Sequence, residues 1–327
     1  MRNLITDVAG LRVGNATDMA LASGVTALLF DGPAVASIAI GGGAPGTRDT
    51  SLLEPGMTVE TVDALVLSGG SAFGLDAMGG VQAFLREQGR GFPVRDIRVP
   101  IVPGAILFDL LNGGDKAWGR HSPYRDLGYE AAVAAGLDFD LGSCGAGTGA
   151  TTVDVKGGLG SASAATPAGF TVGALVAVNA IGSGLVGPGP HFWAAPYERD
   201  GEFGGRGWPA SMPDLSNAAV KGTAPENTTI AIVATDAALT RAQAKRMAMM
   251  AQDGMGRALR PAHAAFDGDL VMSAATGARM VAPEPGDLVD IGVAAADCLA
   301  RAIARALYEA RALPFAGALP AWRDLFG

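Results

Sequence analysis

The sequence is poor in the residues that build disulfide frameworks and metal centres. Its 327 residues include only two cysteines, Cys144 and Cys298, which lie far apart in the chain. Their number and spacing exclude a disulfide framework or a zinc site and favour a reducing compartment. The histidines, His121, His191 and His263, are scattered without the spacing of metal ligands. We therefore expect no metal and no cofactor.

Charge and long apolar runs are also scarce. Charged residues make up 17% of the chain, aromatic residues 6%, and the formal net charge is −8. This balance, without a dense Lys/Arg patch, argues against a nucleic-acid partner. The longest apolar stretch, 169–189, contains Asn179, Ser183 and several glycines, which favours a buried strand and turn over a membrane span. Since the first residues also lack a signal-peptide core, we expect a soluble, cytoplasmic protein without a membrane partner.

Apolar residues and glycine are abundant instead. The former make up 49% of the chain and glycine occurs 48 times, as in a well-packed globular protein with many tight turns. We take residues 1–327 as a single domain. Residues 24–31 and 35–43 are typical of successive strands. Residues 62–89 are predicted as a strand, a glycine turn and a helix with Ser71 as its N-cap.

The later segments complete the predicted fold class. An apolar strand region covers 99–110, and the glycine-rich segment 142–164 predicts a loop followed by a strand. Thr240 is a candidate cap for a helix that continues to about Ala258, and a second long helix begins near Gly286. Because the strands come first and helices flank them without a strict βαβ rhythm, we expect an α+β layered sandwich.

The junction at Asn227 and Thr228 carries the main chemical hypothesis. Residues 196–227 show no clean period, and irregular stretches of this length are often functional. The apolar run 228–236, typical of a strand buried on both faces, follows directly. One interpretation is strand punctuation, since Asn favours turns and Thr favours strands. The other is cleavage before Thr228, whose new α-amino group would then serve as the base for its own hydroxyl.

Two aspartates form the second candidate cluster. Asp267 and Asp269 are two residues apart, so in an extended strand both carboxylates point to the same side. They could then hold the amino group or hydroxyl of Thr228. The alternative is that Asp267-Gly268 is a hairpin turn that joins two strands within 265–277.

Further polar residues have two interpretations each. Lys156 could stabilise an anion near a nucleophile, or it could be a solvated lysine at a strand end. Asn179 lies within an apolar run, so its amide belongs to a structural network or donates to an oxyanion. Arg48 and Asp49 follow a glycine turn, where an ion pair is the favoured interpretation over a pocket wall.

Taken in order, four strings resemble a known family. They are "LSGGSAFGLDA" (67–77), "GAGTGATT" with "KGGLGSAS" (145–163), "NTTIAIVATDA" (227–237) and "RPAHAAFDGDLVMSAATG" (260–277). Together they are similar to the DmpA-type self-processing aminopeptidases and amidases of peptidase family S58, which include β-aminopeptidases and nylon-oligomer hydrolases.

The resemblance implies an αββα core similar to N-terminal-nucleophile hydrolases. It implies self-cleavage at Asn227–Thr228 into an α chain, 1–227, and a β chain, 228–327, which assemble as a homo-oligomer of αβ units. Asp267 and Asp269 match the acidic pair of the nylon-oligomer branch. Lys156 and Asn179 match the family's supporting lysine and asparagine, the latter as the oxyanion donor.

One segment departs from the family pattern. Where several relatives place a tyrosine near the oxyanion hole, this chain has Phe108, which lacks a hydroxyl. The apolar "GAIL" (104–107) also lacks the acidic residue with which aminopeptidases bind a substrate's free amine. The resemblance therefore implies an amide hydrolase for a small peptide or oligoamide more than a strict aminopeptidase.

Three hypotheses remain open at this level. The first is an autoprocessed amidohydrolase with Thr228 as nucleophile. The second is an acyltransferase of the ornithine acetyltransferase type, in which the acyl group passes to an amine. The third is an uncleaved small-molecule binding protein, in which "SGGSAFG" (68–74), with Ser71, cradles an anion at a helix N-terminus.

Overall fold

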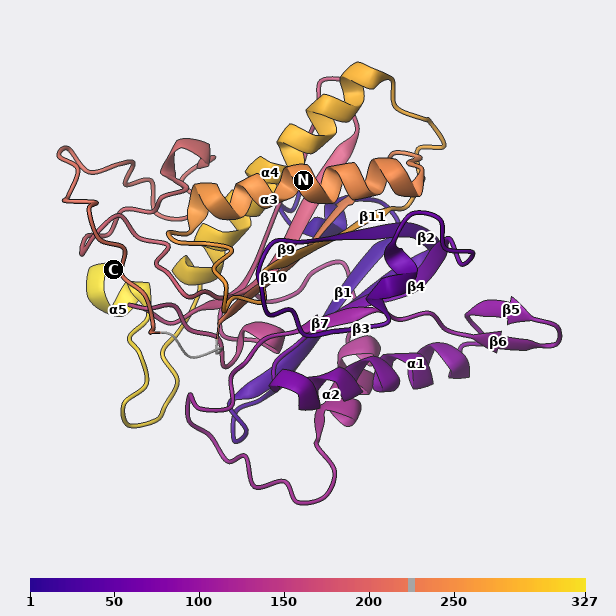
Figure 1. The fold of residues 1–327 in the computed structure, drawn as a ribbon, viewed down its shortest axis with the longest axis horizontal. Helices are drawn as coiled ribbons and strands as arrows, with labels where there is room; N and C mark the ends of the chain where they lie inside the picture. The colour runs from indigo at the N-terminus through magenta and orange to yellow at the C-terminus, as the bar shows by residue number, and fades with distance from the viewer. Residues whose placement is uncertain (223–226) are drawn as a thin grey trace.

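The computed structural model describes residues 1–222 and 227–327, and its strands form one continuous mixed sheet and a separate hairpin. The order in the sheet is β3-β7-β4-β2-β11-β10-β9-β8, with β1 paired to β2. The strands are β1 (Leu11–Asp18), β2 (Ser23–Ile40), β3 (Thr47–Arg48), β4 (Thr61–Ser68), β7 (Gly104–Ile106), β8 (Gly158–Ala165), β9 (Thr171–Asn179), β10 (Thr228–Thr235) and β11 (Leu270–Ala275). Strands β5 (Phe92–Val94) and β6 (Ile97–Val99) form the hairpin, which projects from the body in Figure 1. The main helices are α1 (Ala77–Glu87), α2 (Tyr124–Val133), α3 (Arg241–Ala258), α4 (Pro285–Tyr308) and α5 (Trp322–Phe326).

Strand β2 joins two halves of the sheet. Its first part, Ser23–Phe30, pairs antiparallel with β1, whereas its last part, 35–40, pairs antiparallel with β11. The pairing with β4 shifts register between Leu29 and Ala34. We predicted two successive strands here, and this prediction was wrong, because the Gly-Pro pair inside the run produces an irregularity in one long strand instead of a turn.

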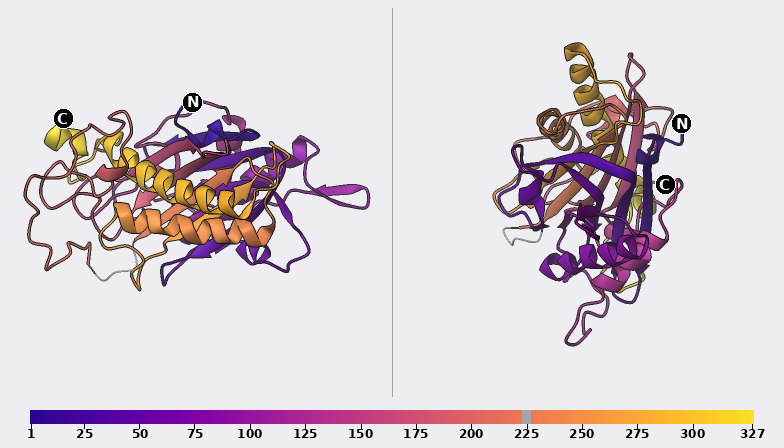
Figure 2. Two further views of the ribbon diagram at one scale, coloured as in Figure 1. Left: turned by 90° about the horizontal axis from the view of Figure 1, so that it is seen from above. Right: turned by 90° about the vertical axis from the view of Figure 1, so that its right-hand side faces the viewer.

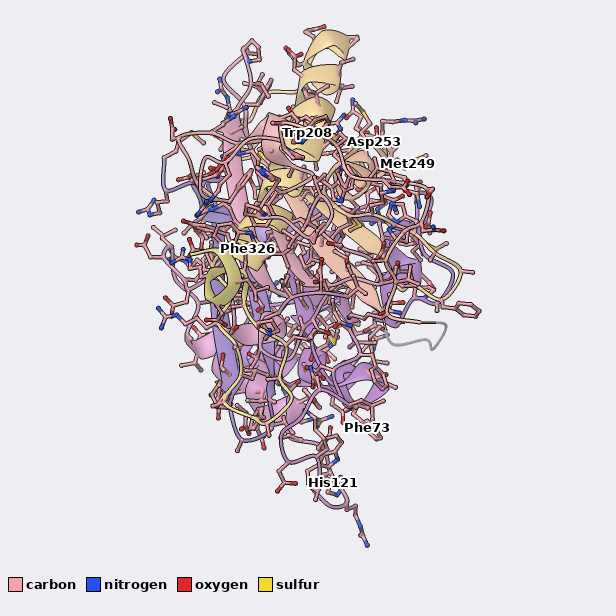
Figure 3. The ribbon with its side chains drawn as sticks, turned by 90° about the vertical axis from the view of Figure 1, so that its left-hand side faces the viewer. Phe73, His121, Trp208, Met249, Asp253 and Phe326 are labelled. Carbon is pink, nitrogen blue, oxygen red and sulfur yellow. The ribbon has the colours of Figure 1, made fainter. Side chains whose placement is uncertain are left out.

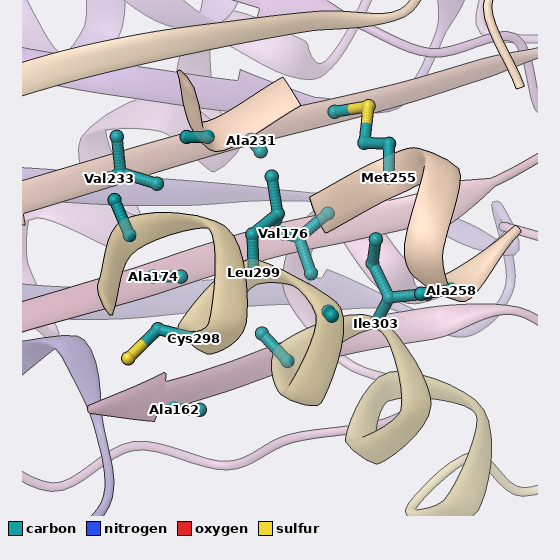
Figure 4. Close-up of a cluster of buried hydrophobic side chains, with 14 of the residues drawn as sticks. Ala162, Ala174, Val176, Ala231, Val233, Met255, Ala258, Cys298, Leu299 and Ile303 are labelled. Atoms are coloured by element: carbon teal, nitrogen blue, oxygen red, sulfur yellow. The ribbon is translucent and has the colours of Figure 1, made fainter. Parts of the chain in front are cut away.

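The two halves of the sheet pack face to face, with helices outside. A central core holds Leu28, Phe30 and Leu67 from one half against Leu175 and Ile232 from the other. A second core joins α1 and α2 to β2 and β4. The third joins α3 and α4 to β8–β11 (Figure 4). Figures 1 and 2 show α3 and α4 side by side across one face and α1 and α2 on the opposite face. The predicted αββα layering is confirmed.

Several predictions of local structure are confirmed. Strand β10 is buried along its whole length, with Ile232 in the central core and Val233 against α3 and α4. Helix α3 begins after Thr240, which forms a capping box with Gln243, and α4 begins at Pro285. No helix among the described residues is long and apolar enough to cross a membrane.

Other local predictions were wrong. Residues 265–277 do not form a hairpin, because β11 pairs parallel with β10, and α3 provides the connection that parallel strands need. Ser71 does not cap α1, which begins at Ala77. Ser71 instead opens a short 3-10 helix, Ser71–Asp76, with a φ of 52°. Of the strand region predicted over 99–110, only β7 pairs in the sheet.

Candidate active site

The predicted residues meet where β10 begins. Thr228 is the first residue of β10 and pairs with Asn179, the last residue of β9. Asn227, one residue earlier, forms a parallel bridge with Asp267. Asn227, Thr228 and Asp267 are 2%, 5% and 1% exposed, so this junction is buried. Residues 223–226, the part of the irregular segment before Asn227, lie outside the described residues.

Two donors converge on the carbonyl of Asn227. The hydroxyl of Thr228 donates to this oxygen, and the backbone N–H of Gly268 donates to it over 2.9 Å. Gly268 also packs closely on the threonine, since a Cβ at this position would lie 2.6 Å from Thr228 Oγ1. The nucleophile candidate and a backbone donor therefore both lie at the peptide bond that precedes Thr228.

Asp269 anchors the start of β10. Its Oδ1 accepts the backbone N–H of Thr229 over 2.7 Å. Its Oδ2 accepts the backbone N–H of His263 over 2.9 Å and lies 3.1 Å from the Nδ1 of that ring. Every one of these groups is on β10 or on the turn that leads into β11. Asp269 thus fixes the position of these two segments relative to each other.

Asp267 differs from Asp269 in its hydrogen bonding. It is 1% exposed, and neither carboxylate oxygen has a hydrogen-bond partner among the described residues. Burial, reinforced by the neighbouring carboxylate of Asp269, raises the pKa of Asp267 to about 7. The turn can approach this closely because β2 is followed by glycines: a Cβ on Gly42 would lie 2.2 Å from the carbonyl oxygen of Asp267.

Lys156 is fully buried, so its interpretation as a solvated strand-end lysine was wrong. Its Nζ donates to the carbonyl oxygens of Gly147, Ala150 and Gly157 over 2.9, 2.7 and 2.9 Å. Burial lowers the pKa of Lys156 to about 7, and the negative charge of Asp109 partly opposes this shift. The lysine therefore holds the predicted glycine-rich loop around its ammonium group.

Asn179 belongs to a hydrogen-bond network. Its Oδ1 accepts the backbone N–H of Thr151 over 3.0 Å and lies 3.3 Å from Nζ of Lys221. Its Nδ2 donates to the carbonyl of Phe108 over 3.0 Å. These contacts place Asn179 in a structural network beside Phe108, and its pairing with Thr228 in the sheet brings it next to the nucleophile candidate.

A cavity of about 460 Å³ lies beside Asn179 and Lys156, whereas Thr228, Asp267 and Asp269 are not among its lining residues. Phe108, Lys156 and Asn179 line it, together with Asp109, Lys221 and the segment 313–319 near the C-terminus. The wall is part apolar and part polar. It combines phenyl and leucine side chains with two lysines and amide groups, as small-molecule sites commonly do.

Ser71 lies outside this lining. Its backbone N–H donates to Leu107 over 2.9 Å. In the same turn, the N–H of Gly70 donates to Asp109 over 2.7 Å, and Ser23 donates to the other oxygen of that carboxylate over 2.6 Å. The glycine turn thus already holds an internal carboxylate in the place where an anionic ligand was considered.

The remaining predicted pair is structural. Arg48 and Asp49 form the expected turn ion pair, with Nε 3.6 Å from Oδ2. Three further residues of the site, His263, Gly268 and Lys221, were not predicted from the sequence. His263 and Gly268 lie in the string "RPAHAAFDGD", where a glycine between two aspartates was the available signal. Nothing in the pattern around Lys221 distinguishes it from a solvated lysine.

Comparisons with known proteins agree with this arrangement. The sequence model of peptidase family S58 matches residues 3–318. The uncharacterized aminopeptidase Rv1333 of Mycobacterium tuberculosis is 44% identical, over 99% of this chain and 98% of that protein. The uncharacterized aminopeptidase ML1167 of Mycobacterium leprae is 40% identical, over 95% of this chain and 91% of that protein.

Solved structures show the same fold. A β-aminopeptidase of Burkholderia sp. superposes with a TM-score of 0.72 at 22% identity, over 98% of this chain and 90% of that one. The L-aminopeptidase D-Ala-esterase/amidase of Ochrobactrum anthropi, a variant of the Ntn hydrolase fold, superposes with a TM-score of 0.68 at 21% identity. The match covers 99% of this chain and 92% of that one. The chain is therefore a peptidase or amidohydrolase with this fold, and it belongs to peptidase family S58.

Proposed function

We propose that the chain cleaves its own Asn227–Thr228 bond and then uses Thr228 as an N-terminal nucleophile against amide bonds of small peptides or oligoamides. One observation carries the proposal: the Thr228 hydroxyl and the Gly268 N–H both donate to the carbonyl of Asn227. A nucleophile on one side of a peptide bond and a donor on its oxygen are the two requirements of acyl transfer.

The processing step follows from these contacts. Thr228 Oγ adds to the carbonyl carbon of Asn227, and the negative charge that develops on the carbonyl oxygen is stabilised by the Gly268 N–H. Collapse breaks the C–N bond, the amine takes the proton from the hydroxyl, and an ester links residues 227 and 228. Water then hydrolyses the ester, which leaves a carboxylate on Asn227 and a free amino group on Thr228.

Asp267 is the natural partner of the new amino group. In the uncut chain its buried carboxyl has no hydrogen-bond partner among the described residues and a pKa of about 7. An ammonium group formed next to it would favour the carboxylate and lower that pKa. Cleavage would then convert a poorly solvated acid into an ion pair that orients the nucleophile.

Hydrolysis of a substrate would reuse the same parts. The neutral α-amine of Thr228 takes the hydroxyl proton as Oγ attacks the substrate amide, and returns it to the leaving amine. Water then hydrolyses the acyl ester on Oγ, which releases the acid and restores the hydroxyl. Asn179 pairs with Thr228 in the sheet, and this neighbourhood supports its proposed role as the oxyanion donor in addition to its bond to Phe108. Lys156, in its protonated form, adds positive charge to the cavity wall. Asp269 holds the start of β10 in place because its carboxylate accepts the backbone N–H of Thr229.

The cavity supports an amide substrate without a strict need for a free amine. The carboxylate in its lining, Asp109, is buried and already accepts hydrogen bonds from Ser23 and Gly70. Phe108 offers an aromatic wall but no hydroxyl. We therefore propose that peptides with a blocked N-terminus, or oligoamides, are hydrolysed as well as free peptides.

Processing is tested by mass spectrometry and N-terminal sequencing of the purified protein. Wild type and Thr228→Ser should yield fragments 1–227 and 228–327, the second with a free N-terminus at residue 228. Thr228→Ala should remain intact. Thr235→Val, at the far buried end of the same strand, is the matched control and should process normally. An intact wild-type chain after prolonged incubation refutes the proposal.

Hydrolysis and acyl transfer are separated by product analysis. The processed protein is incubated with free and N-acetylated peptide anilides, with and without an added primary amine such as ornithine. Hydrolysis gives the free acid in both cases, whereas a transferase gives the new amide as the main product. Light scattering of the same sample tests the proposed homo-oligomer of αβ units.

A further inference from the structure

His263 forms a defined contact with the acidic pair. It lies on the turn between α3 and β11, with a side chain 27% exposed and a φ of 58°. Both its backbone N–H and its Nδ1 approach the same carboxylate oxygen of Asp269, at 2.9 and 3.1 Å. Gly41 supports the ring, since a Cβ there would lie 2.7 Å from Nδ1. The ring is therefore held against Asp269 by packing as well as by charge.

The charged groups that act on His263 are carboxylates. Asp269 and Asp267 face it from its own turn, and the backbone of Gln252 in α3 also favours its protonated form. The hydrogen bond with Asp269 raises the pKa of His263 above its ordinary value, which favours the imidazolium. The cluster at the start of β10 thus combines two buried carboxyl groups with one imidazole whose protonated form is favoured.

We propose that His263 is a positioning residue for the reaction: its imidazolium offsets the charge of Asp269, so that Asp267 can ionise and hold the amino group released at Thr228. The inference rests on the proposed function and adds a residue to it. Its physical basis is that two adjacent buried carboxyl groups resist double ionisation unless a cation lies beside them. His263 is that cation before cleavage, when the Thr228 nitrogen is still an uncharged amide.

The variant His263→Asn separates charge from structure. Asn places an amide N–H where Nδ1 was and tolerates the left-handed backbone better than most residues. It therefore keeps the bond to Asp269 and removes the titratable charge. His191→Asn is the matched control, because His191 is half-buried on a separate loop, where its ring hydrogen-bonds with the carbonyl of Gly207.

The first measurement is the rate of processing against pH, started by refolding the urea-denatured precursor. In wild type the rate should rise with pH as Asp267 ionises, because its carboxylate holds the amino group of Thr228 as the C–N bond breaks. In His263→Asn this acid limb should move to higher pH by about 0.5–1 unit, because the lost cation makes Asp267 harder to ionise. Near neutral pH that shift slows processing by about threefold to tenfold, with recovery at higher pH. An unmoved limb, or equal slowing at every pH, overturns the role of His263.

The second measurement does not depend on processing. Imidazole NMR of the uncut Thr228→Ala chain follows only three histidines, and His121 lies on an exposed loop at one tip of the molecule (Figure 3). His263 should titrate above the ordinary value of a histidine, and Asp269→Asn should lower its pKa. Unchanged titration in Asp269→Asn refutes the pair. If the pair is present but the wild type never processes or hydrolyses, the proposed function fails instead.

Discussion

The backbone at Gly268 offers the sharpest test of the geometry at the scissile bond. Gly268 has no left-handed φ, so alanine is compatible with its backbone. The added Cβ of Gly268→Ala would nevertheless lie 2.6 Å from Oγ1 and 2.9 Å from Cγ2 of Thr228. It would also lie 3.0 Å from the carbonyl oxygen of Ala44, so it cannot simply tilt away. Because carbon atoms pack at about 3.5–4.0 Å, either Thr228 or the turn must shift.

The magnitude follows from this overlap. Overpacking of this kind costs about 1–3 kcal/mol. If the strain is relieved by moving the Thr228 hydroxyl away from the Asn227 carbonyl, the same energy is added to the barrier of processing. Since each 1.36 kcal/mol is tenfold in rate, we expect processing to slow by about 5- to 150-fold.

The assay is a time course of the two fragments on a denaturing gel, with thermal unfolding measured on the same samples. Gly256→Ala is the matched control, because a Cβ there meets no atom within 4 Å. It should process at the wild-type rate and gain up to about 1 kcal/mol, since Gly256 lies within α3. Wild-type processing by Gly268→Ala, with an unchanged melting temperature, would show that the Thr228 side chain is not where the argument requires it.

Three further predictions concern charge and packing. The raised pKa of Asp267, about 7, means that the folded uncut chain holds a proton that the unfolded chain releases near pH 4. The free energy of unfolding therefore falls as pH rises from 4 to 7. In the Thr228→Ala background, Asp267→Asn should remove this pH dependence, as measured by melting curves at several pH values. An equal pH dependence with and without Asp267→Asn refutes the raised pKa. Lys156→Met leaves three carbonyls without their donor and should destabilise the chain by about 3 kcal/mol or more. The control Lys245→Met, which removes the ion pair with Glu54, should cost under about 1 kcal/mol. Equal losses of unfolding free energy in chemical denaturation contradict the buried role of Lys156. Ile232→Ala, in the central core, should cost about 2–5 kcal/mol and Met249→Ala, which is 45% exposed, under about 0.5 kcal/mol, as judged by urea unfolding.

The sequence by itself determined those features that depend on local periodicity and on strings of residues. The β-branched apolar run after Thr228 predicted a buried strand, and Thr240 predicted the start of α3. Four ordered strings were enough to identify the family. These signals are short-range, because capping, strand burial and motif spacing involve neighbours along the chain.

The tertiary structure decided which distant groups share one environment. The Asp267-Gly268 pair has the sequence of a hairpin turn, yet the parallel pairing of β10 and β11 makes it a connection that brings the Gly268 N–H to the Asn227 carbonyl. Lys156 resembles a solvated lysine until three carbonyls of a folded loop surround it. His263 becomes a partner of Asp269 only when its turn closes against Gly41. Burial, charge proximity and hydrogen-bond direction arise from contacts between segments, so no local pattern of residues specifies them.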